Sequence, residues 1–431
     1  TNALYTHYNL YEDFDTNDYI RKIGHKLASY TGNNRHYSFY VINDNNINAF
    51  AGPNGVIGIH TGLITACETE DELAAVIAHE ISHVTQNHLS RRYEYSSTQG
   101  SINTIATLLA AILIGSQDPS AGIAALMGGM GLNMQQQLKN SRQHESEADA
   151  FGIQLLYKTG YNPHAMGDFF ARLSKESQLD TIKVPEILRT HPVSEHRLAE
   201  AENRAHNLPQ KKEIEPKSYL NYIKNRILHQ NKTLISAAEI KTIKHNPMLT
   251  CYLETLNKTK KGLNAPDCME ELAFNAQASP IFLSALLQNK LTLKDSSSTS
   301  DNEALDKIID LKVALFPKSV SIPMYYSRLL RKQSKQKEAE HILEQAETHL
   351  NYKYNVYMEL SEYNAKNQRK ATAYLNLAKA YMQTGNVERS KYFLKQAEKN
   401  NSKNEESIEE DILRFKEHYD NLLNNKNKIK D

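Results

Sequence analysis

The chain contains one short pattern with specific chemistry, H-E-x-x-H, formed by His79, Glu80 and His83. The spacing of the two histidines places their rings on one face of a helix, one turn apart. Two imidazoles so placed can both reach one tetrahedral Zn²⁺ ion at about 2.0–2.1 Å, and Glu80 is left beside it to take a proton from water. The pattern predicts one zinc ion per chain with Glu80 as the catalytic base. The alternative is a chance match in a helix with surface histidines.

A catalytic zinc ion usually has a third protein ligand, and an acidic helix further along the chain provides the best candidate. This helix is predicted from about Gln135 to Lys158. Glu145 and Asp149 share one of its faces, whereas Glu147 is turned to the opposite side, where we expect it to be solvated. We therefore expect Glu145 to bind the metal and Asp149 to accept a hydrogen bond from a ligand imidazole.

Three other histidines are weaker ligand candidates, namely His60, His88 and His144. His88 follows His83 by five residues, so on a continuing helix it would point away from the metal face. The ligand set favours hydrolysis, because zinc lowers the pKa of bound water from about 15.7 toward about 7 and Glu80 can remove its proton. An amide substrate is the natural one, since the chain has neither a phosphate-binding loop nor a dinucleotide fingerprint.

The pattern H-E-x-x-H lies in a run, Glu70 to Val84, that reads as an amphipathic helix without Gly or Pro. Thr69 and Glu72 form a capping box at its start. Before it, three short strands are predicted, at 36–42, 47–51 and 56–60, and the last two are joined by the turn Gly52-Pro53-Asn54-Gly55. A polar helix is predicted from about Asn17 to Tyr30. These elements predict an α+β domain, in which one strand is either a peptide-binding edge or part of an ordinary hairpin.

The length of 431 residues predicts more than one domain. Because 51 basic residues balance 50 acidic ones, the net charge of +1 gives no reason to expect nucleic acid as a partner. The chain begins at Thr1, and no basic segment with an apolar core precedes the fold, so we expect that a targeting segment was removed or that the chain was trimmed. Cys251 and Cys268 are either a disulfide or two separate thiols, and with Cys67 they do not fix the compartment.

A nearly uncharged insert occupies residues 95–138, where Asp118 is the one charged residue. Its apolar runs, 102–114 and 121–132, are shorter than the roughly 20 residues needed to cross a bilayer. We weigh three interpretations: buried core helices, a plug over the active site, or contact with a membrane surface.

The composition changes near Asn207, and Leu208–Glu213 resembles a linker, so we predict domains at 1–207 and 208–431. The second domain is predicted to be all-α, because two segments fit a helix-pair repeat of about 34 residues. The alternative is a generic helical bundle. The packing positions are Ser327, Leu330, Ala339, Leu343 and Ala346 in one segment, and Ala378, Tyr381, Ser390, Leu394 and Ala397 in the other.

H-E-x-x-H followed by Glu145-x-x-x-Asp149 resembles the zinc peptidase family that includes the membrane heat-shock metalloproteases and the CAAX prenyl proteases. Asn48-Ala49-Phe50 and Thr190-His191-Pro192 match its soluble, periplasmic branch in Gram-negative bacteria, whose members carry a C-terminal TPR domain. The resemblance implies a zincin-type domain with His79, His83 and Glu145 as zinc ligands and Glu80 as the base. It also implies that His191 is a fourth ligand or switch, and that Arg197 contacts substrate or transition state.

By that resemblance we expect a zinc metalloendopeptidase in the periplasm. Its substrates would be unfolded or misassembled outer-membrane proteins, and its repeats would bind these clients or the outer-membrane assembly machinery. The alternative is mainly a TPR scaffold or chaperone for outer-membrane protein assembly, with a latent protease site.

Overall fold

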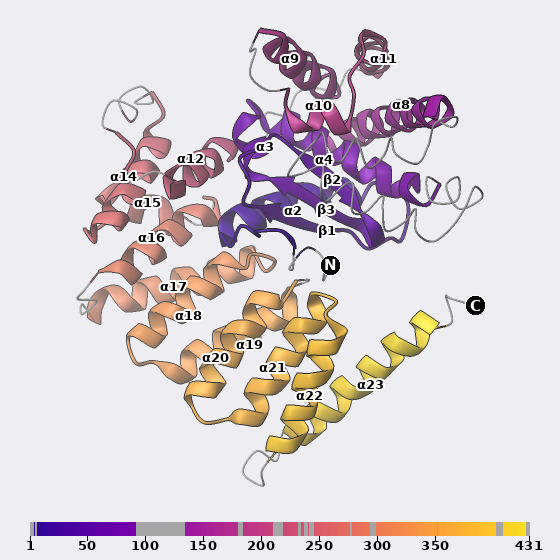
Figure 1. Ribbon diagram of the computed structural model, residues 1–431. Helices are drawn as coiled ribbons and strands as arrows, with labels where there is room; N and C mark the ends of the chain where they lie inside the picture. The colour runs from indigo at the N-terminus through magenta and orange to yellow at the C-terminus, as the bar shows by residue number, and fades with distance from the viewer. Residues whose placement is uncertain are drawn as a thin grey trace. The chain divides into compact units, whose positions relative to one another are not determined.

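The computed structural model describes residues 4, 7–91, 134–179, 184–209, 219–231, 234–236, 240, 245–275, 278–293, 299–350, 352–401 and 408–427. The chain divides into two compact units (Figure 1). The mixed unit comprises Asn9–Glu12 and Tyr19–Lys224, and the helical unit comprises Thr1–Tyr8, Asp13–Asp18 and Asn225–Asp431. The boundary at 207/208 stays a prediction. Residues 95–133 of the uncharged insert lie outside the described residues, so its three interpretations remain open.

The mixed unit is built on a sheet of three strands, β1 (Ser38–Ile42), β2 (Ala49–Gly52) and β3 (Val56–His60), in the order β1-β3-β2. Strands β2 and β3 pair antiparallel and are connected by a one-turn 3-10 helix, η1 (Pro53–Gly55), which confirms the predicted hairpin. Strand β1 runs parallel to β3, a pairing that the sequence did not specify. Every residue of β3, the central strand, is buried.

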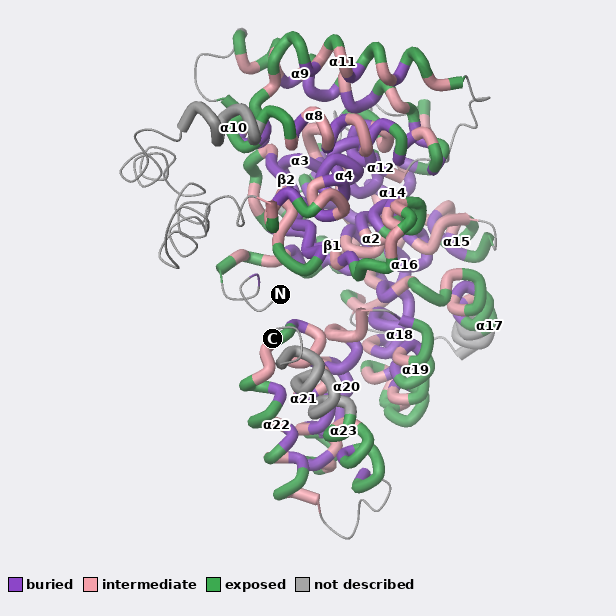
Figure 2. Tube along the Cα trace, turned by 90° about the vertical axis from the view of Figure 1, so that its right-hand side faces the viewer, coloured by how far each residue is buried: buried purple, intermediate pink, exposed green. Residues whose placement is uncertain are grey.

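Helix α2 (Phe14–Ala28) covers one face of the sheet, where the ring of His25 meets Phe39 edge-on at 5.2 Å. Helix α4 (Glu70–Thr85) packs against β2 and β3, and its first residue, Glu70, accepts a hydrogen bond from the hydroxyl of Tyr19 on α2 at 2.8 Å. Figure 2 shows α4 as a buried element of this unit. The other helices of the mixed unit are α3 (Thr61–Ala66), α8 (Met134–Thr159), α9 (Ala165–Leu179), α10 (Glu186–Thr190) and α11 (Glu195–His206).

Helix α4 is the predicted helix of the H-E-x-x-H pattern, one residue longer than expected at its C-terminus. The hydroxyl of Thr69 accepts a hydrogen bond from the backbone N–H of Glu72 at 3.2 Å, as the capping box predicts. Its apolar stripe is buried. Helix α8 packs closely against α4 near Gly152, where a Cβ would lie 2.6 Å from the methyl group of Met166 and 3.4 Å from the backbone of Ala78. This close packing brings the acidic face of α8 to the two histidines.

The helical unit contains no strand among its described residues, which agrees with the expected all-α region. A disulfide joins Cys251 to Cys268, with Cα atoms 6.2 Å apart, and so resolves the two alternatives of the sequence. Its main helices are α12 (Leu220–Asn231), which begins in the mixed unit, α14 (Pro247–Lys261), α15 (Asp267–Phe274), α16 (Pro280–Thr292), α17 (Thr299–Leu315), α18 (Ser321–Lys332), α19 (Gln336–His349), α20 (Tyr354–Lys366), α21 (Lys370–Gln383), α22 (Val387–Asn400) and α23 (Ile408–Asn427).

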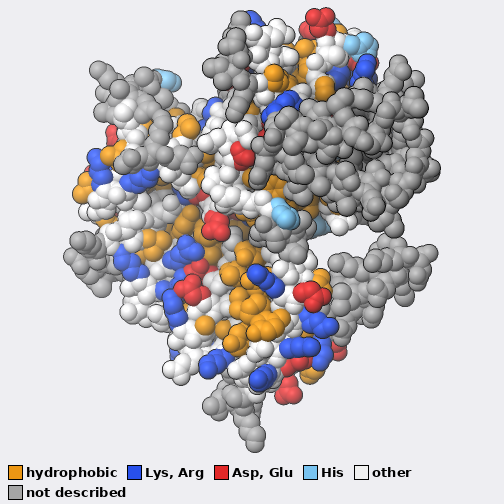
Figure 3. All heavy atoms as spheres, viewed as in Figure 1, with side chains coloured by type: hydrophobic (Ala, Val, Ile, Leu, Met, Phe, Trp, Pro, Cys, Tyr) orange, Lys and Arg blue, Asp and Glu red, His pale blue; other side chains and the backbone are white. Residues whose placement is uncertain are grey.

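Consecutive helices in this unit pack as hairpins, α18 on α19, α20 on α21 and α21 on α22. The predicted packing positions of the repeats are buried, except that Tyr381 is half-buried. On the face drawn in Figure 3, hydrophobic side chains gather over the region of α19 to α22. These features are compatible with TPR-type repeats, which remain a proposal. Among the described residues, every helix is too short or too polar to cross a bilayer.

Candidate metal centre

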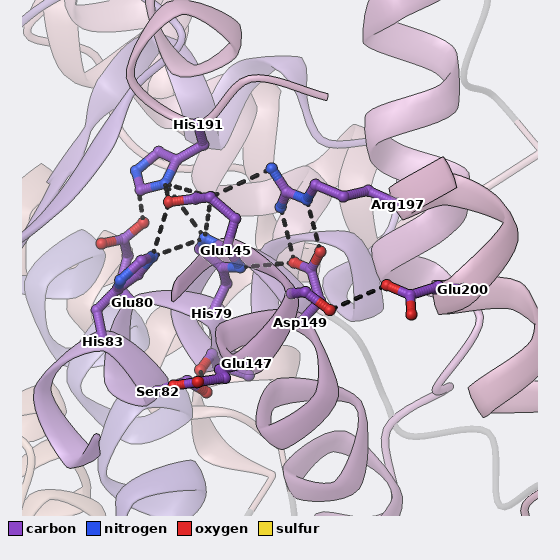
Figure 4. Close-up of polar contacts among 12 residues, drawn as sticks. His79, Glu80, Ser82, His83, Glu145, Glu147, Asp149, His191, Arg197 and Glu200 are labelled. Carbon is purple, nitrogen blue, oxygen red and sulfur yellow. Dashed lines mark hydrogen bonds and ion pairs between the residues drawn. The ribbon is translucent and has the colours of Figure 1, made fainter. Parts of the chain in front are cut away.

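Three elements of the mixed unit bring five of the predicted site residues together (Figure 4). Helix α4 carries His79, Glu80 and His83, and α8 carries Glu145 on the face toward them. His191 comes from the residue that ends α10. We call these five residues the metal centre.

The donor atoms of the metal centre converge on one point. His79 Nε2 lies 3.0 Å from His83 Nε2, 3.2 Å from His191 Nδ1 and 3.4 Å from a carboxylate oxygen of Glu145. The other Glu145 oxygen lies 3.5 Å from His83 Nε2. Groups of three or more His, Cys, Asp or Glu residues with all ligand atoms within 4.8 Å of one another could hold a metal ion. In the described part of the chain there is one such group, and it consists of His79, His83, Glu145 and His191.

These separations fit a zinc ion. Ligands at about 2.0–2.1 Å around a tetrahedral ion are about 3.3–3.4 Å apart, close to the observed values. Both carboxylate oxygens of Glu80 are buried and have no hydrogen-bond partner in the described part of the chain. Buried polar groups are normally satisfied, so carboxylate oxygens without a hydrogen bond beside converging lone pairs indicate a place for a ligand, even with His191 Nε2 3.4 Å from one of them.

The electrostatics of the metal centre call for a positive charge. Burial lowers the pKa of His79, but its hydrogen bonds to Asp149 and Glu145 outweigh burial and raise the pKa to about 10. Burial raises the pKa of Glu145, but its interactions with His191 and His79 hold that pKa well below the usual range. Burial also raises the pKa of Glu80, against the effect of His191 and His79. A proton or a bound cation can supply the charge that these carboxylates require.

Asp149 and Arg197 hold His79 on the side of its ring that faces away from the metal centre. Asp149 Oδ1 lies 2.9 Å from His79 Nδ1, as the sequence predicted, which leaves the Nε2 lone pair directed at the centre. The guanidinium of Arg197, from α11, donates to both oxygens of Asp149 at 2.8 and 2.9 Å. It also lies 3.2 Å from Glu145. Arg197 is buried and fully engaged with these carboxylates in this structure.

His191 closes the metal centre on the side opposite α4. Its Nδ1 lies 3.0 Å from Glu145 and its Nε2 lies 3.4 Å from Glu80. Its backbone N–H donates to Ile187 at 2.8 Å, and Arg197 donates to the carbonyl of Pro192 at 2.7 Å. The ring is therefore held in place from both sides along the chain.

Two neighbouring residues, His88 and Glu147, have surroundings that the sequence did not predict. Helix α4 ends at Thr85, and Asn87 has a left-handed φ of 57°, so the chain reverses and His88 returns to place its Nδ1 2.8 Å from His83 Nδ1. Glu147 is half-buried and paired instead of free in solvent: its carboxylate accepts a hydrogen bond from Arg91 at 2.6 Å and lies 3.2 Å from His88 Nε2. The asparagine after the helix was the signal for the reversal, since Asn tolerates left-handed backbone.

The environment of His88 keeps it neutral. Burial and the nearby His144 lower its pKa to about 4, against the effect of Glu147. The ring of His144 stacks on His88 with centroids 4.5 Å apart. His60, the third weak candidate, lies at the end of β3 with its Nδ1 3.6 Å from Asp44. None of these three histidines belongs to the metal centre.

Comparison with known proteins agrees with this geometry. Residues 15–205 match Peptidase family M48. Over 194 residues the chain is 42% identical to the putative beta-barrel assembly-enhancing protease of Vibrio cholerae, and over 191 residues it is 39% identical to the beta-barrel assembly-enhancing protease of Escherichia coli. The mitochondrial metalloendopeptidase OMA1 of Schizosaccharomyces pombe is 28% identical over 186 residues.

These matches cover part of each protein. The match to the V. cholerae protein takes in 45% of this chain and 40% of the relative, and the corresponding shares for the E. coli protein are 44% and 39%. For the S. pombe protein they are 43% and 51%. The chain thus spans about two-fifths of the length of the two bacterial relatives.

Proposed function

Because residues 15–205 belong to peptidase family M48, as their motifs indicated, we propose that this chain is a zinc-dependent endopeptidase with one zinc ion. His79, His83 and Glu145 would hold the ion, and Glu80 would be the general base. The observation that carries the proposal is the convergence of these donor atoms at tetrahedral spacing beside the buried carboxylate of Glu80, which makes no hydrogen bond in the described part of the chain. When bound, zinc supplies Lewis acidity that makes water more acidic and polarises a peptide carbonyl.

Glu80, Asp149 and Arg197 then have defined roles in catalysis and in positioning the ligands. Glu80 takes the proton of the attacking water and delivers it to the leaving amine, and its raised pKa suits both steps. Asp149 fixes the tautomer of His79. Arg197 holds Asp149 and neutralises part of the charge of Glu145. Its engagement with these carboxylates supports a role behind the ligands rather than contact with substrate.

We further propose that His191 is a fourth ligand that keeps the resting enzyme inactive. Its Nδ1 occupies the position from which water or a carbonyl oxygen would approach, 3.2 Å from His79 Nε2. A substrate would have to displace it. Strand β2, at the edge of the sheet and packed against α4, is a suitable template for an extended peptide.

The relatives named beta-barrel assembly-enhancing proteases suggest where this activity is used. We propose a periplasmic location and substrates among unfolded or misassembled outer-membrane proteins. The helical unit would contain TPR-type repeats that bind clients or assembly machinery, and exposed side chains such as Tyr392 offer apolar contact. Contact of the uncharged insert with a membrane surface stays a hypothesis.

A second function has specific support from the closed site. With His191 among the ligands, the chain would act mainly as a repeat scaffold or chaperone for outer-membrane protein assembly and rarely as a protease. Replacement of His191 by alanine tests whether the protease site is latent: basal cleavage should rise if His191 inhibits, and fall if it assists the transition state.

The test of the main proposal combines metal content with cleavage of unfolded casein by the full chain. Glu80→Gln should retain one zinc ion and lose 10²–10⁴-fold in cleavage rate. Glu202→Gln, at an exposed glutamate of α11, is the matched control and should behave as the wild type. Unchanged cleavage by Glu80→Gln would exclude Glu80 as the base. Absence of zinc from the wild type would exclude the proposed function.

A further inference from the structure

The two proposed histidine ligands are supported by different groups. His79 Nδ1 meets a carboxylate, Asp149, at 2.9 Å. His83 Nδ1 instead meets another histidine, since His88 Nδ1 lies 2.8 Å away. His88 is almost fully buried, with 4% of its surface exposed. Neither the H-E-x-x-H pattern nor the metal centre includes it.

The backbone brings His88 back to His83 by an anchored reversal. After α4 ends, Asn87 adopts its left-handed conformation, and the Nη2 of Arg35 donates to its side-chain oxygen at 2.6 Å. The Nη1 of Arg35 donates to the carbonyl of Val84 at 2.7 Å, which satisfies the end of the helix. One guanidinium therefore holds both ends of the turn that positions His88.

His88 is in turn held by a carboxylate. Its Nε2 lies 3.2 Å from Glu147, and the same oxygen accepts from Arg91 at 2.6 Å. The stacked ring of His144 fixes the plane of His88. The arrangement is thus carboxylate, histidine, histidine, parallel to the shorter Asp149–His79 arrangement on the other ligand.

The tautomers follow from the geometry. His83 faces the metal centre with Nε2, so a metal-binding His83 must carry its proton on Nδ1 and donate it to His88 Nδ1. His88 can accept that proton bond only if its own proton sits on Nε2. That N–H then points at the carboxylate of Glu147, where an acceptor is present. All three groups agree in a single protonation pattern.

We propose that His88 is a positioning residue that holds His83 in its metal-binding tautomer and orientation, with Glu147 holding His88. This inference rests on the proposed zinc site. Groups that orient a metal-bound histidine commonly change metal affinity 10–100-fold when removed. His88 would therefore act on zinc binding itself, without contact to the metal or the substrate.

The test measures zinc affinity of the full chain by competition with a chromophoric chelator. We expect His88→Ala to bind zinc 10–100-fold more weakly. His88→Asn should recover most of the affinity, because its side-chain oxygen can take the acceptor position of Nδ1. Glu147→Gln should have a smaller effect than His88→Ala. His206→Ala, at an exposed histidine of the same unit, is the control and should have none.

Thermal unfolding of the zinc-free variants separates positioning from structure. Positioning predicts that His88→Ala and His88→Asn unfold at similar temperatures without zinc and differ with it. If His88→Ala binds zinc within twofold of the wild type, the inference is wrong while the zinc site stands. Equal losses in His88→Ala and His88→Asn would also overturn it, in favour of a structural role. A wild type without zinc would overturn both.

Discussion

Two buried clusters of charge, one in each unit, have similar composition and different chemistry. In the metal centre, histidines and carboxylates converge from α4 and α8. In the helical unit, Arg226 is buried with Asp13 and Asp15, at the start of α2. Arg226 Nε donates to Asp13 at 2.8 Å, and its terminal nitrogens donate to the hydroxyls of Tyr252 and Tyr325 at 3.2 and 3.3 Å. We call these five residues the Arg226 cluster.

The difference lies in what is left unpaired. In the Arg226 cluster, a guanidinium that can only donate is surrounded by acceptors, so its N–H groups and both carboxylates have partners. In the metal centre, the lone pairs of three rings and a carboxylate face one another, and Glu80 has no hydrogen bond in the described part of the chain. Burial and shifted pKa values occur in both clusters. They therefore mark buried charge, and the unbalanced donor set marks the functional site.

The largest expected effect on stability comes from a substitution that disrupts the Arg226 cluster. Arg226→Met leaves Asp13 and Asp15 buried without a cation, which should lower the free energy of unfolding of the helical unit by about 3–5 kcal/mol. Urea unfolding followed by circular dichroism measures the loss, and zinc affinity should not change. In a chain that also carries Asp13→Asn and Asp15→Asn, the loss should be much smaller.

A surface pair provides the control for this measurement. Arg414 on α23 pairs with Glu410 at 2.9 Å, and both side chains are mostly exposed. Arg414→Met should cost less than about 1 kcal/mol. If Arg226→Met costs no more than Arg414→Met, the cluster is not the paired charge network described here.

Removal of metal tests the unbalanced cluster with a smaller expected effect. A ligand at 100 times its Kd stabilises the folded state by about 2.7 kcal/mol. With free zinc held at that ratio, the free energy of unfolding of the mixed unit should fall by this amount when a chelator removes the ion. Thermal unfolding with and without chelator measures it. Glu145→Gln should abolish the difference, whereas Arg226→Met should retain it. A zinc-dependent gain that survives Glu145→Gln would place the ion elsewhere.

The pH dependence of the Arg226 cluster has a definite sign. Burial raises the pKa of Asp15 from 3.8 to about 7, with Arg226 opposing and Asp13 and Asp18 adding to the rise. Between these two values the folded state holds a proton that the unfolded state has lost, so stability falls as pH rises and levels off above about pH 7. One proton limits the loss between pH 6 and pH 7 to about 1.4 kcal/mol.

Unfolding of Asp15→Asn by urea at pH 6 and pH 7 checks this sign. The variant should lose the slope that the wild type shows in this window. A slope of the same size in Asp15→Asn would assign the titration to another group.

Helix α4 and most of the metal centre could be predicted from local sequence patterns. The Thr69 cap and the spacing of His79 and His83 depend on residues within one helix, and Glu145 with Asp149 repeats the same logic on α8. The return of His88 depends instead on a single left-handed residue. Outside the metal centre, contacts across long separations had no local signal.

The Arg226 cluster shows why such contacts are hidden. Asp13 and Arg226 are 213 residues apart, and each looks like an ordinary surface charge in its own segment. The parallel pairing of β1 with β3 is similar, because a strand pattern does not reveal its neighbour or direction.

The smallest effect concerns backbone strain in the turns of the two units. In the helical unit, the turns after α18, α20 and α21 have left-handed residues at Ser334, Gln368 and Gly385. Each turn is closed by the same backbone hydrogen bond, from the next residue to a carbonyl five residues earlier, at 2.9 to 3.0 Å. Only Gly385 adopts this conformation without a penalty from a Cβ atom.

We therefore expect Gln368→Gly to stabilise the helical unit by about 0.5–1 kcal/mol, because glycine has no Cβ penalty in the left-handed conformation. The side chain that is removed is exposed, so its loss costs little. A higher urea midpoint would show the gain, and Gly385→Ala should shift the midpoint in the opposite direction. Asn87→Gly in the mixed unit should bring no gain, since Asn87 accepts a hydrogen bond from Arg35 that glycine cannot accept. Equal gains at both positions would mean that Asn87 relieves strain no better than Gln368 does, and that its side chain contributes nothing to holding the turn before His88.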